Sequence, residues 1–254
     1  MDREKLFEDF LTQCKSKSRE EICGQGNPNA DILIIGKEPY CEEIIDPIKD
    51  RQKYLDYLRE KNNNCRDHYF YRETDDFSKL VTWQNYQKLV FAIYKGNKYN
   101  EYNKNVIDFE RFAYTTELSS VPRPKSNYNL AKETILKRLD FFKNSDFIQS
   151  FPVLILACGP YIKNIGEGEN RQIDNTFGVE YDGDEIGRCS KENRKEYNIG
   201  NWFYTHHNKI DTKYFKAGEK LVIHTRQLSG AINKELFRDI GKKVHEHLHN
   251  YGYL

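Results

Sequence analysis

An acidic residue follows a short apolar run near the start of the chain. Residues 32–35 are all aliphatic, and Gly36 ends this run before the charged turn at residues 37–40 (KEPY). A β-branched run with Asp before it and Gly after it predicts a strand that is buried on both faces of a parallel sheet. Ligands of open parallel sheets gather at the carboxyl ends of the strands. Glu38 is therefore expected at an edge of the sheet where ligands bind.

A histidine ends a second apolar run near the other end of the chain. Residues 221–223 are aliphatic, His224 follows, and residues 225–229 (TRQLS) are mostly polar. A carboxylate can stabilise positive charge that develops in a reaction, and a histidine can donate a hydrogen bond to developing negative charge. Glu38 and His224, each at the end of a predicted strand, are therefore the candidate catalytic pair.

Further apolar patterns predict the elements that must position this pair. Two more apolar runs predict strands at residues 112–118 and 153–158. Apolar residues at helical spacing predict helices at residues 2–14, 51–60, 77–94, 130–147 and 233–248, with the three Asn residues at 62–64 ending the second of them. The sequence predicts an α/β fold, with a three-layer α/β/α arrangement around a central, mainly parallel four-stranded sheet.

The composition excludes some classes of protein. The 254 residues carry a formal net charge of +1, so overall charge alone does not indicate a nucleic-acid partner. No apolar stretch approaches the roughly 18 residues that a membrane span needs, and the N-terminus is charged. Six cysteines without paired spacing indicate free thiols and a reducing compartment. We therefore expect a cytoplasmic protein with no membrane partner.

Two motifs resemble those of a known enzyme family. Residues 24–40 (GQGNPNADILIIGKEPY) are similar to the first signature of the uracil-DNA glycosylase superfamily, a Gly-rich lead-in, a hydrophobic strand and a Gly-x-acid-Pro-Tyr loop. Residues 221–229 (LVIHTRQLS) resemble the second signature, a strand followed by a His-Pro-Ser-Pro-Leu-Ser loop. With two further strands between the motifs, the resemblance extends over about residues 20–250.

The resemblance implies a monofunctional DNA glycosylase, which hydrolyses the bond between a flipped-out base and its sugar. Glu38 would orient the attacking water or stabilise the sugar cation, although Glu42 or Glu43 could substitute for it. His224 would donate a hydrogen bond to the base oxygen next to the scissile bond. Two further residues belong to the expected base pocket, Gly36 and Tyr40, and the Tyr40 ring would close it against bases of the wrong size.

The same resemblance predicts the residues that contact DNA. Leu228 matches the family's wedge, an apolar side chain that fills the space left by an extruded nucleotide, and an ordinary core leucine is the alternative. Arg226 replaces a small hydroxyl residue of the family motif and could contact phosphate. Arg123 and Lys125 form a basic patch in a Pro-rich loop. Other basic patches are residues 188–195 and the pair Lys213 and Lys216.

Glu117 bears on which base would enter the pocket. It stands at the end of the predicted second strand, where the family carries an Asn that reads the base. An ionised Glu only accepts hydrogen bonds, so it suits the N4 amino group of cytosine and repels a uracil oxygen. This predicts a cytosine-type substrate, including a modified cytosine such as the hypermodified 5-hydroxymethylcytosine of phage DNA. If the alignment slips by one residue, Thr116 occupies the pocket instead.

Residues 165–218 are longer and more polar than a crossover between two strands requires. Residues 178–181 and 202–207 have the pattern of extra strands separated by a charged turn. We interpret this segment as a β-rich insertion that acts as a lid or as a hairpin that contacts DNA. The sequence has no low-complexity linker or internal repeat, so we expect one domain over residues 1–254.

No cofactor is expected. Iron–sulfur members of the family carry a Cys-x-x-Cys before the first strand, whereas this chain has only Cys14 there, and four thiolates are needed to hold a cluster. His245, His247 and His249 lack partners with the spacing of metal ligands. The prediction is thus a monomeric enzyme without metal, iron–sulfur cluster or cofactor. The alternatives are an ordinary uracil-DNA glycosylase, a catalytically silent nucleic-acid-binding member, and an interaction protein with the same fold.

Overall fold

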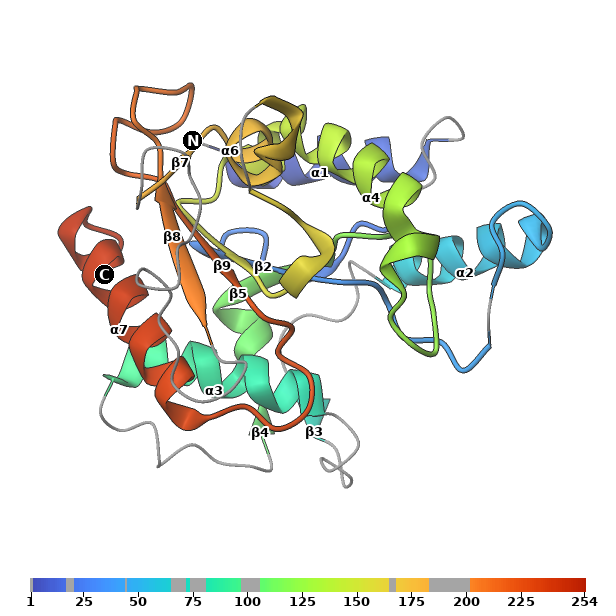
Figure 1. Ribbon diagram of the computed structural model, residues 1–254, viewed down its shortest axis with the longest axis horizontal. Coiled ribbons are helices and arrows are strands. Elements are labelled where there is room, and N and C mark those ends of the chain that lie inside the picture. Colours follow the sequence, from blue (N-terminus) through green and yellow to red (C-terminus); the bar gives the residue numbers. More distant parts are fainter. Residues whose placement is uncertain are drawn as a thin grey trace.

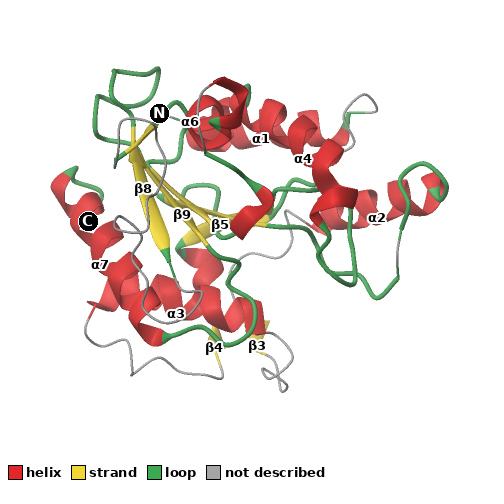
Figure 2. Ribbon diagram, in the orientation of Figure 1, coloured by secondary structure: helices red, strands yellow, loops and turns green. Residues whose placement is uncertain are grey.

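The computed structural model describes residues 2–16, 21–43, 45–64, 72–73, 81–96, 106–164, 168–182 and 202–254. They form a mixed α/β fold, which confirms the predicted α/β class, and the sheet has seven strands where a central sheet of four was predicted (Figure 1 and Figure 2). The helices are α1 (Arg3–Lys15), α2 (Arg51–Asn64), α3 (Val81–Lys95), α4 (Tyr128–Lys143), α5 (Asp146–Gln149), α6 (Gln172–Phe177) and α7 (Lys234–Asn250). The strands of the large sheet are β1 (Gln25–Gly26), β2 (Ile32–Gly36), β5 (Ala113–Glu117), β6 (Val153–Leu156), β7 (Glu180–Tyr181), β8 (Phe203–His207) and β9 (Leu221–Thr225). A separate pair consists of β3 (Arg72–Glu73) and β4 (Val106–Ile107).

The centre of the sheet is parallel, as predicted. The strand order is β1-β5-β2-β6-β9-β8-β7, and β5, β2, β6 and β9 run parallel to one another. The edge strands β1, β8 and β7 pair antiparallel to their neighbours. Because parallel strands end at the same edge, the loops after β2, β5, β6 and β9 all leave the sheet together.

Alternate residues of the central strands enter two separate hydrophobic clusters. Leu33 and Ile35 of β2 pack with residues of α1, α4, α5 and α6, whereas Ile32 and Ile34 pack with residues of α3 and α7. Figure 1 shows α1, α4 and α6 on one side of the sheet and α3 and α7 on the other. The unbroken aliphatic run in β2 follows from this arrangement, because both faces of the strand are covered.

The helix boundaries depart from the prediction in two places. The prediction that the Asn residues end α2 was wrong, since α2 continues to Asn64. The Asn62 amide accepts from the Cys23 backbone N–H at 2.9 Å and donates to the Glu21 carbonyl at 2.8 Å, so a buried tertiary contact holds this turn in the helix. The helix predicted at residues 130–147 divides into α4 and α5, because Ser145 caps the N-terminus of α5.

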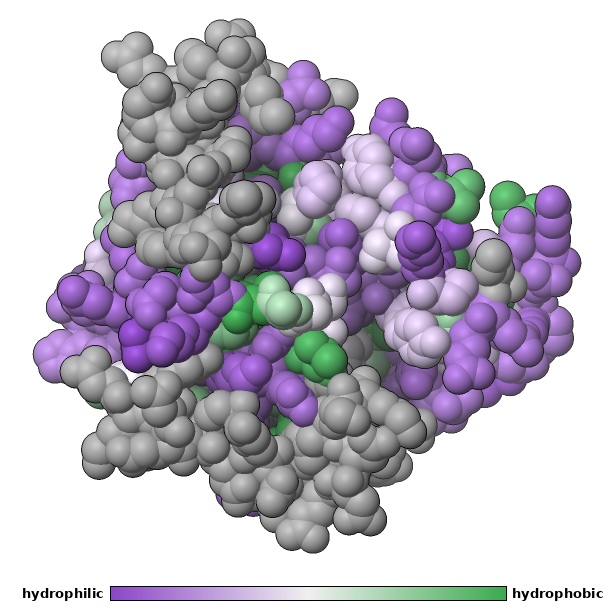
Figure 3. Space-filling view, turned by 60° about the horizontal axis from the view of Figure 1, so that its bottom comes forward, coloured by the Kyte–Doolittle hydropathy of each residue, from purple (hydrophilic) through white to green (hydrophobic). Residues whose placement is uncertain are grey.

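Both extra strands predicted in the insertion are present as β7 and β8, and they extend the sheet beyond β9. The parts of the insertion at residues 165–167 and 183–201 lie outside the described residues, so its roles as lid or hairpin stay predictions. Within the described ranges, no helix is long and apolar enough to cross a membrane. In Figure 3, the end of the molecule that carries α2 is mostly hydrophilic.

Candidate functional site at the carboxyl edge of the sheet

The order of the four parallel strands marks one position on the sheet edge. Across the sheet they lie in the order β5-β2-β6-β9. The chain therefore leaves β2 toward β5 on one side and leaves β6 toward β9 on the other, so these two connections run in opposite directions. In open α/β sheets a ligand binds in the crevice outside the carboxyl ends of the strands at such a point. The loop after β2 carries Glu38, and β6 is followed by the turn Gly159–Tyr161 (η4).

Gly159 is the place where three of these loops meet. Its φ of +55° lies in the left-handed region, which glycine adopts without strain. A Cβ at Gly159 would lie 3.8 Å from Lys37 Cε, 3.6 Å from the Gln227 backbone nitrogen and 3.9 Å from Arg226 Cα. The loops after β2, β6 and β9 therefore contact one another at this turn, which brings the two sequence motifs together.

His224 contacts the same turn through its side chain. The side chain is buried, and its Nε2–H donates to the Gly159 carbonyl at 2.8 Å, so Nδ1 carries the free lone pair. Burial lowers the pKa of His224 to about 4, and the hydrogen bond to Gly159 opposes this effect only in part. His224 is therefore neutral at pH 7, and in this conformation its donor nitrogen is already in use.

Glu38 is held in a loop that is joined to the loop after β5. The Gly36 and Lys37 carbonyls accept from the N–H groups of Leu118 and Ser119 at 3.0 and 2.8 Å, and the Pro39 carbonyl accepts from the Arg123 N–H at 3.0 Å. These bonds continue the parallel pairing of β2 and β5 past the sheet edge. The backbone around Glu38 is thus fixed on both sides by ladder bonds.

The Glu38 carboxyl is partly buried and incompletely paired. Its Oε2 is buried without a hydrogen-bond partner among the described residues. The ammonium group of Lys37 lies 4.7 Å from the centre of the Tyr161 ring, and burial followed by the nearby Glu38 raises the pKa of the Tyr161 hydroxyl. Buried oxygens without partners are rare in folded proteins and often mark sites of ligand binding or catalysis.

Glu117 is the second carboxyl at this edge. It ends β5 opposite Gly36, and a Cβ on Gly36 would lie 2.2 Å from Glu117 Oε2, so the carboxyl occupies the space above the glycine. That Oε2 is also buried without a partner among the described residues. Burial, followed by the charge of Glu38, raises the pKa of Glu117 to about 8. Glu117 is therefore mostly protonated at neutral pH.

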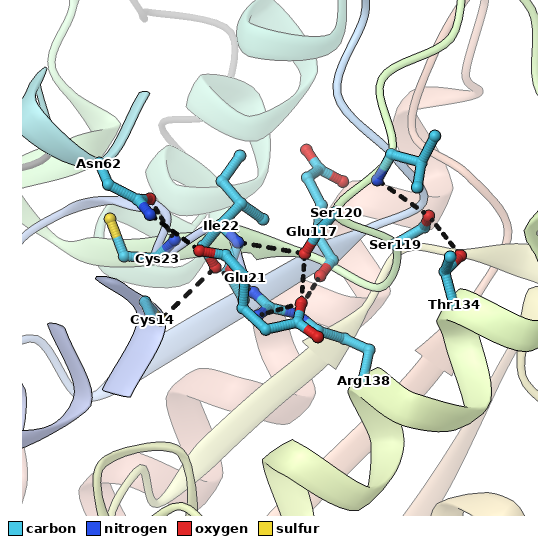
Figure 4. Close-up of polar contacts among 12 residues, drawn as sticks. Cys14, Glu21, Ile22, Cys23, Asn62, Glu117, Ser119, Ser120, Thr134 and Arg138 are labelled. Atoms are coloured by element: carbon cyan, nitrogen blue, oxygen red, sulfur yellow. Dashed lines mark hydrogen bonds and ion pairs between the residues drawn. The ribbon is translucent and has the colours of Figure 1, made fainter. Parts of the chain in front are cut away.

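A buried arginine holds the end of β5 in place (Figure 4). Arg138 of α4 is inaccessible to solvent, forms an ion pair with Glu21 at 3.1 Å, and donates from Nε to the Glu117 carbonyl at 3.2 Å and from Nη2 to Thr116 Oγ1 at 2.9 Å. Its Nη2 also donates to the Ile22 carbonyl. In Figure 4 the Glu117 carboxyl points away from this network. Arg138 therefore fixes the Glu117 backbone while leaving its carboxyl without a bonded cation.

Comparison of the chain with protein-family models, curated proteins and solved structures finds no match.

The structure changes the interpretation of two predicted site residues. The Tyr40 ring is 71% exposed, so it does not close a pocket, although the Tyr40 backbone pairs with Arg123. Leu228 is fully buried in the cluster with α3 and α7, and its carbonyl accepts from Asn85 Nδ2 at 3.0 Å. Of the two interpretations of Leu228, the structure favours the ordinary core leucine over the wedge, because the apolar side chain fills the core.

The predicted basic residues lie in different environments. Burial lowers the pKa of Lys37, and the nearby charge of Arg226 adds a smaller effect in the same direction. Arg123 is half-buried and donates to the Leu130 carbonyl at 3.0 Å, so its guanidinium holds the loop after β5 against the start of α4. Lys125 is exposed beside it. Of the predicted basic patches, residues 188–195 lie outside the described residues, and Lys213 is ion-paired with Asp146.

Sequence reasoning missed several residues of the site. Tyr57 of α2 has a buried hydroxyl without a partner among the described residues, and burial followed by Glu117 raises its pKa. Tyr161 and Lys37 are adjacent to motif residues and could have been found from their position after the strands. Tyr57 and Arg138 carried no such signal, since each reaches the edge from a helix distant in sequence.

A carboxylate and a histidine also meet away from this edge. Asp174 of α6 accepts from Arg171 Nε at 2.8 Å and lies 3.0 Å from His206 Nδ1 of β8. Among the described residues, no group of three or more His, Cys, Asp or Glu side chains could hold a metal ion. A pocket of about 460 Å³ lined by His207, His247 and neighbouring residues lies at the opposite edge of the sheet, away from Glu38.

Proposed function

We propose that the protein is a DNA glycosylase of the uracil-DNA glycosylase type, with a three-layer α/β/α domain that hydrolyses the N-glycosidic bond of a flipped-out pyrimidine. The observation that carries this proposal is that Glu38 and His224 both approach the turn Gly159–Tyr161, and that Glu38 Oε2 is buried without a hydrogen-bond partner in the described part of the chain. DNA is the proposed partner, and the enzyme acts in the cytoplasm as a monomer without metal or cofactor.

Sheet geometry gives this pair a separation that suits a nucleoside. Glu38 follows β2 and His224 lies in β9, and β6 lies between these strands. Neighbouring strands are about 4.8 Å apart, so the two strands are about 10 Å apart. A nucleoside held between them would present its sugar to Glu38 and its base to His224. Positive charge on the sugar and negative charge on the base would then each face a group that stabilises it.

Each residue has a defined part in the proposed reaction. The Glu38 carboxylate stabilises the sugar cation or orients the water that attacks it. The neutral His224 donates from Nε2 to the base oxygen, and for this the imidazole exchanges its bond to the Gly159 carbonyl for one to the base. Lys37 and Arg226 lie at the same turn, where their positive charge suits the phosphates of the bound strand.

The protonation of Glu117 changes the argument on which base is bound. The prediction of a cytosine-type base assumed an ionised carboxylate, whereas a pKa of about 8 makes the carboxyl neutral at pH 7. A neutral carboxyl donates one hydrogen bond and accepts another. It can therefore donate to the N3 ring nitrogen of cytosine and accept from its N4 amino group, or accept from the N3–H of uracil and donate to its O4.

A modified cytosine remains the substrate that we propose first. The exposed Tyr40 ring does not close over the base in the proposed site, so it does not reject a bulky group on the base. The hypermodified 5-hydroxymethylcytosine of phage DNA is such a base, which would make the enzyme part of phage defence. The neutral Glu117 equally supports an ordinary uracil-DNA glycosylase of base-excision repair. The occupied His224 donor supports a catalytically silent member that binds nucleic acid.

A base-release assay tests the proposal. DNA containing uracil, cytosine, 5-hydroxymethylcytosine or its glucosylated form is incubated with the protein, and released bases are identified by mass spectrometry. Release of a cytosine derivative alone supports the first substrate, and release of uracil alone supports the repair enzyme. Release of none of them contradicts the glycosylase proposal and favours the silent member.

Two variants separate the role of Glu38 from general effects of charge. Glu38→Gln should lower single-turnover base release by about 100-fold or more, the usual contribution of such a catalytic group, while its circular dichroism spectrum stays that of the wild type. Glu42→Gln makes the same chemical change on an exposed neighbour and should retain full activity. An active E38Q protein would assign the chemistry to another group.

A further inference from the structure

Two aromatic rings flank His224 on the side of β8. The Trp202 ring centre lies 4.9 Å from that of His224 and 5.0 Å from that of Tyr204, and Tyr204 pairs with His224 across the two strands. Trp202 and Tyr204 are both partly exposed, although His224 itself is buried. The planes of Trp202 and Tyr204 are inclined by 34°, so the Tyr204 ring packs against the indole and supports it beside the proposed catalytic histidine.

A partly exposed indole at the edge of a site suits the face of a nucleobase. Base stacking on aromatic side chains is the main way in which proteins bind unpaired nucleic acid, and it tolerates any sequence because every base has such a face. The loop after β9 brings Arg226 to the same edge, where a phosphate of the strand would lie. Aromatic and basic side chains occur together in grooves that bind single-stranded nucleic acid.

The second observation concerns extrusion of a base from a duplex. Proteins that distort double-stranded DNA frequently insert an apolar side chain between its bases. The candidate for such a side chain here, Leu228, is fully buried in the core. Its carbonyl is also held by Asn85, so the loop is fixed at this point. Trp202 thus offers an aromatic ring where an unpaired strand would lie. Leu228, the candidate wedge, is instead buried in the core.

We infer that the protein acts on single-stranded DNA and that Trp202 stacks on the base next to the target base. This inference rests on the proposed function, because it takes DNA as the ligand. The planes of Trp202 and His224 are inclined by 81°. A base that is hydrogen-bonded in the plane of His224 therefore presents its edge to Trp202, and the base that stacks on the indole is a neighbour in the strand.

Tryptophan fluorescence can test this directly, because the chain contains two tryptophans. Trp83 lies in α3 against Phe109 on the other side of the sheet. The variant Trp83→Phe leaves only Trp202, and Trp202→Phe leaves only Trp83. Each protein is titrated with a 12-nucleotide single strand containing one target base, and with the same strand in a duplex.

Single-stranded DNA should quench the emission of W83F and leave that of W202F unchanged, and the duplex should bind at least ten-fold more weakly. Replacing the target base by an abasic analogue should preserve quenching, whereas abasic analogues on both sides of the target should abolish it. Trp202→Ala should weaken binding of the single strand by about 5- to 150-fold, the range expected for one stacked base. Tyr251→Ala, which changes a partly exposed ring near the end of α7, is the matched control and should bind normally.

Several results would overturn the inference: equal quenching of both single-tryptophan proteins, unchanged affinity of W202A, or tighter binding of the duplex. The same oligonucleotides are analysed for released base, which separates the two proposals. Quenching of Trp202 without base release would contradict the glycosylase and leave single-strand binding intact. Base release without quenching would support the glycosylase and reject the stacking role of Trp202.

Discussion

Replacing Glu117 by Gln should change how the stability of the protein depends on pH. The pKa of this carboxyl is about 8 in the folded protein, where an ordinary Glu has 4.5, because burial and the charge of Glu38 both oppose ionisation. The folded state therefore binds a proton that the unfolded chain has lost at neutral pH. The stability that Glu117 contributes is complete below about pH 4.5, falls as the pH rises, and is lost above about pH 8.

The size of the effect follows from the displacement of the pKa. One pKa unit corresponds to about 1.4 kcal/mol, so the distance from 4.5 to about 8 corresponds to at most about 5 kcal/mol. A Gln side chain has nearly the same shape and stays neutral throughout. E117Q should therefore have a stability close to that of the wild type at pH 5, and should exceed it by several kcal/mol at pH 8.

Urea denaturation at pH 5, 6, 7 and 8 measures the free energy of unfolding of both proteins. The difference between them is the relevant quantity, because other groups that titrate in this range, such as His224 and His247, are common to both. Glu42→Gln makes the same change on the surface and should follow the wild type. If the difference between E117Q and wild type stays constant from pH 5 to pH 8, Glu117 is ionised in the folded protein and the proposed reading of the base by a neutral carboxyl is wrong.

Two further changes test the buried charges that support the fold. Arg138→Met should lower the free energy of unfolding in urea by about 3 kcal/mol, because it leaves the Glu21 carboxylate without its buried partner, whereas Lys137→Met on the exposed side of the same helix should cost less than about 1 kcal/mol. A loss for R138M no larger than that for K137M would contradict the assigned role of Arg138. Lys220 is buried with its pKa lowered to about 7, so its contribution to the stability of the wild type should rise from about pH 7 to pH 10.5, because the unfolded chain stays protonated to a higher pH than the folded protein. Lys220→Met should remove this rise in thermal or urea unfolding, and an identical pH profile for both proteins would show that Lys220 is charged in the fold.

The four central strands were predictable because each is a local signal. An aliphatic run such as residues 32–35 puts apolar side chains on both faces of a strand, which is the pattern of a strand that helices cover on both sides. The ends of the runs also gave the position of Glu38 and His224. Helix boundaries were less predictable, since the end of α2 depends on bonds between Asn62 and residues 21–23, which no local pattern reveals.

The candidate site was predictable only in part. The sequence by itself determined that Glu38 and His224 lie at the ends of two strands of one parallel sheet, because residue type and strand period are local properties. Only the tertiary structure decided which side chains at this edge are buried and which carboxyl is protonated. Burial of Glu117 above Gly36, and of Leu228 in the core, depends on elements far apart in the chain that exclude water together. From the sequence alone, Leu228 could be a wedge or a core residue, and the Glu117 carboxyl could be charged or neutral. The neighbours decide between these states, because desolvation and packing are properties of the assembled fold.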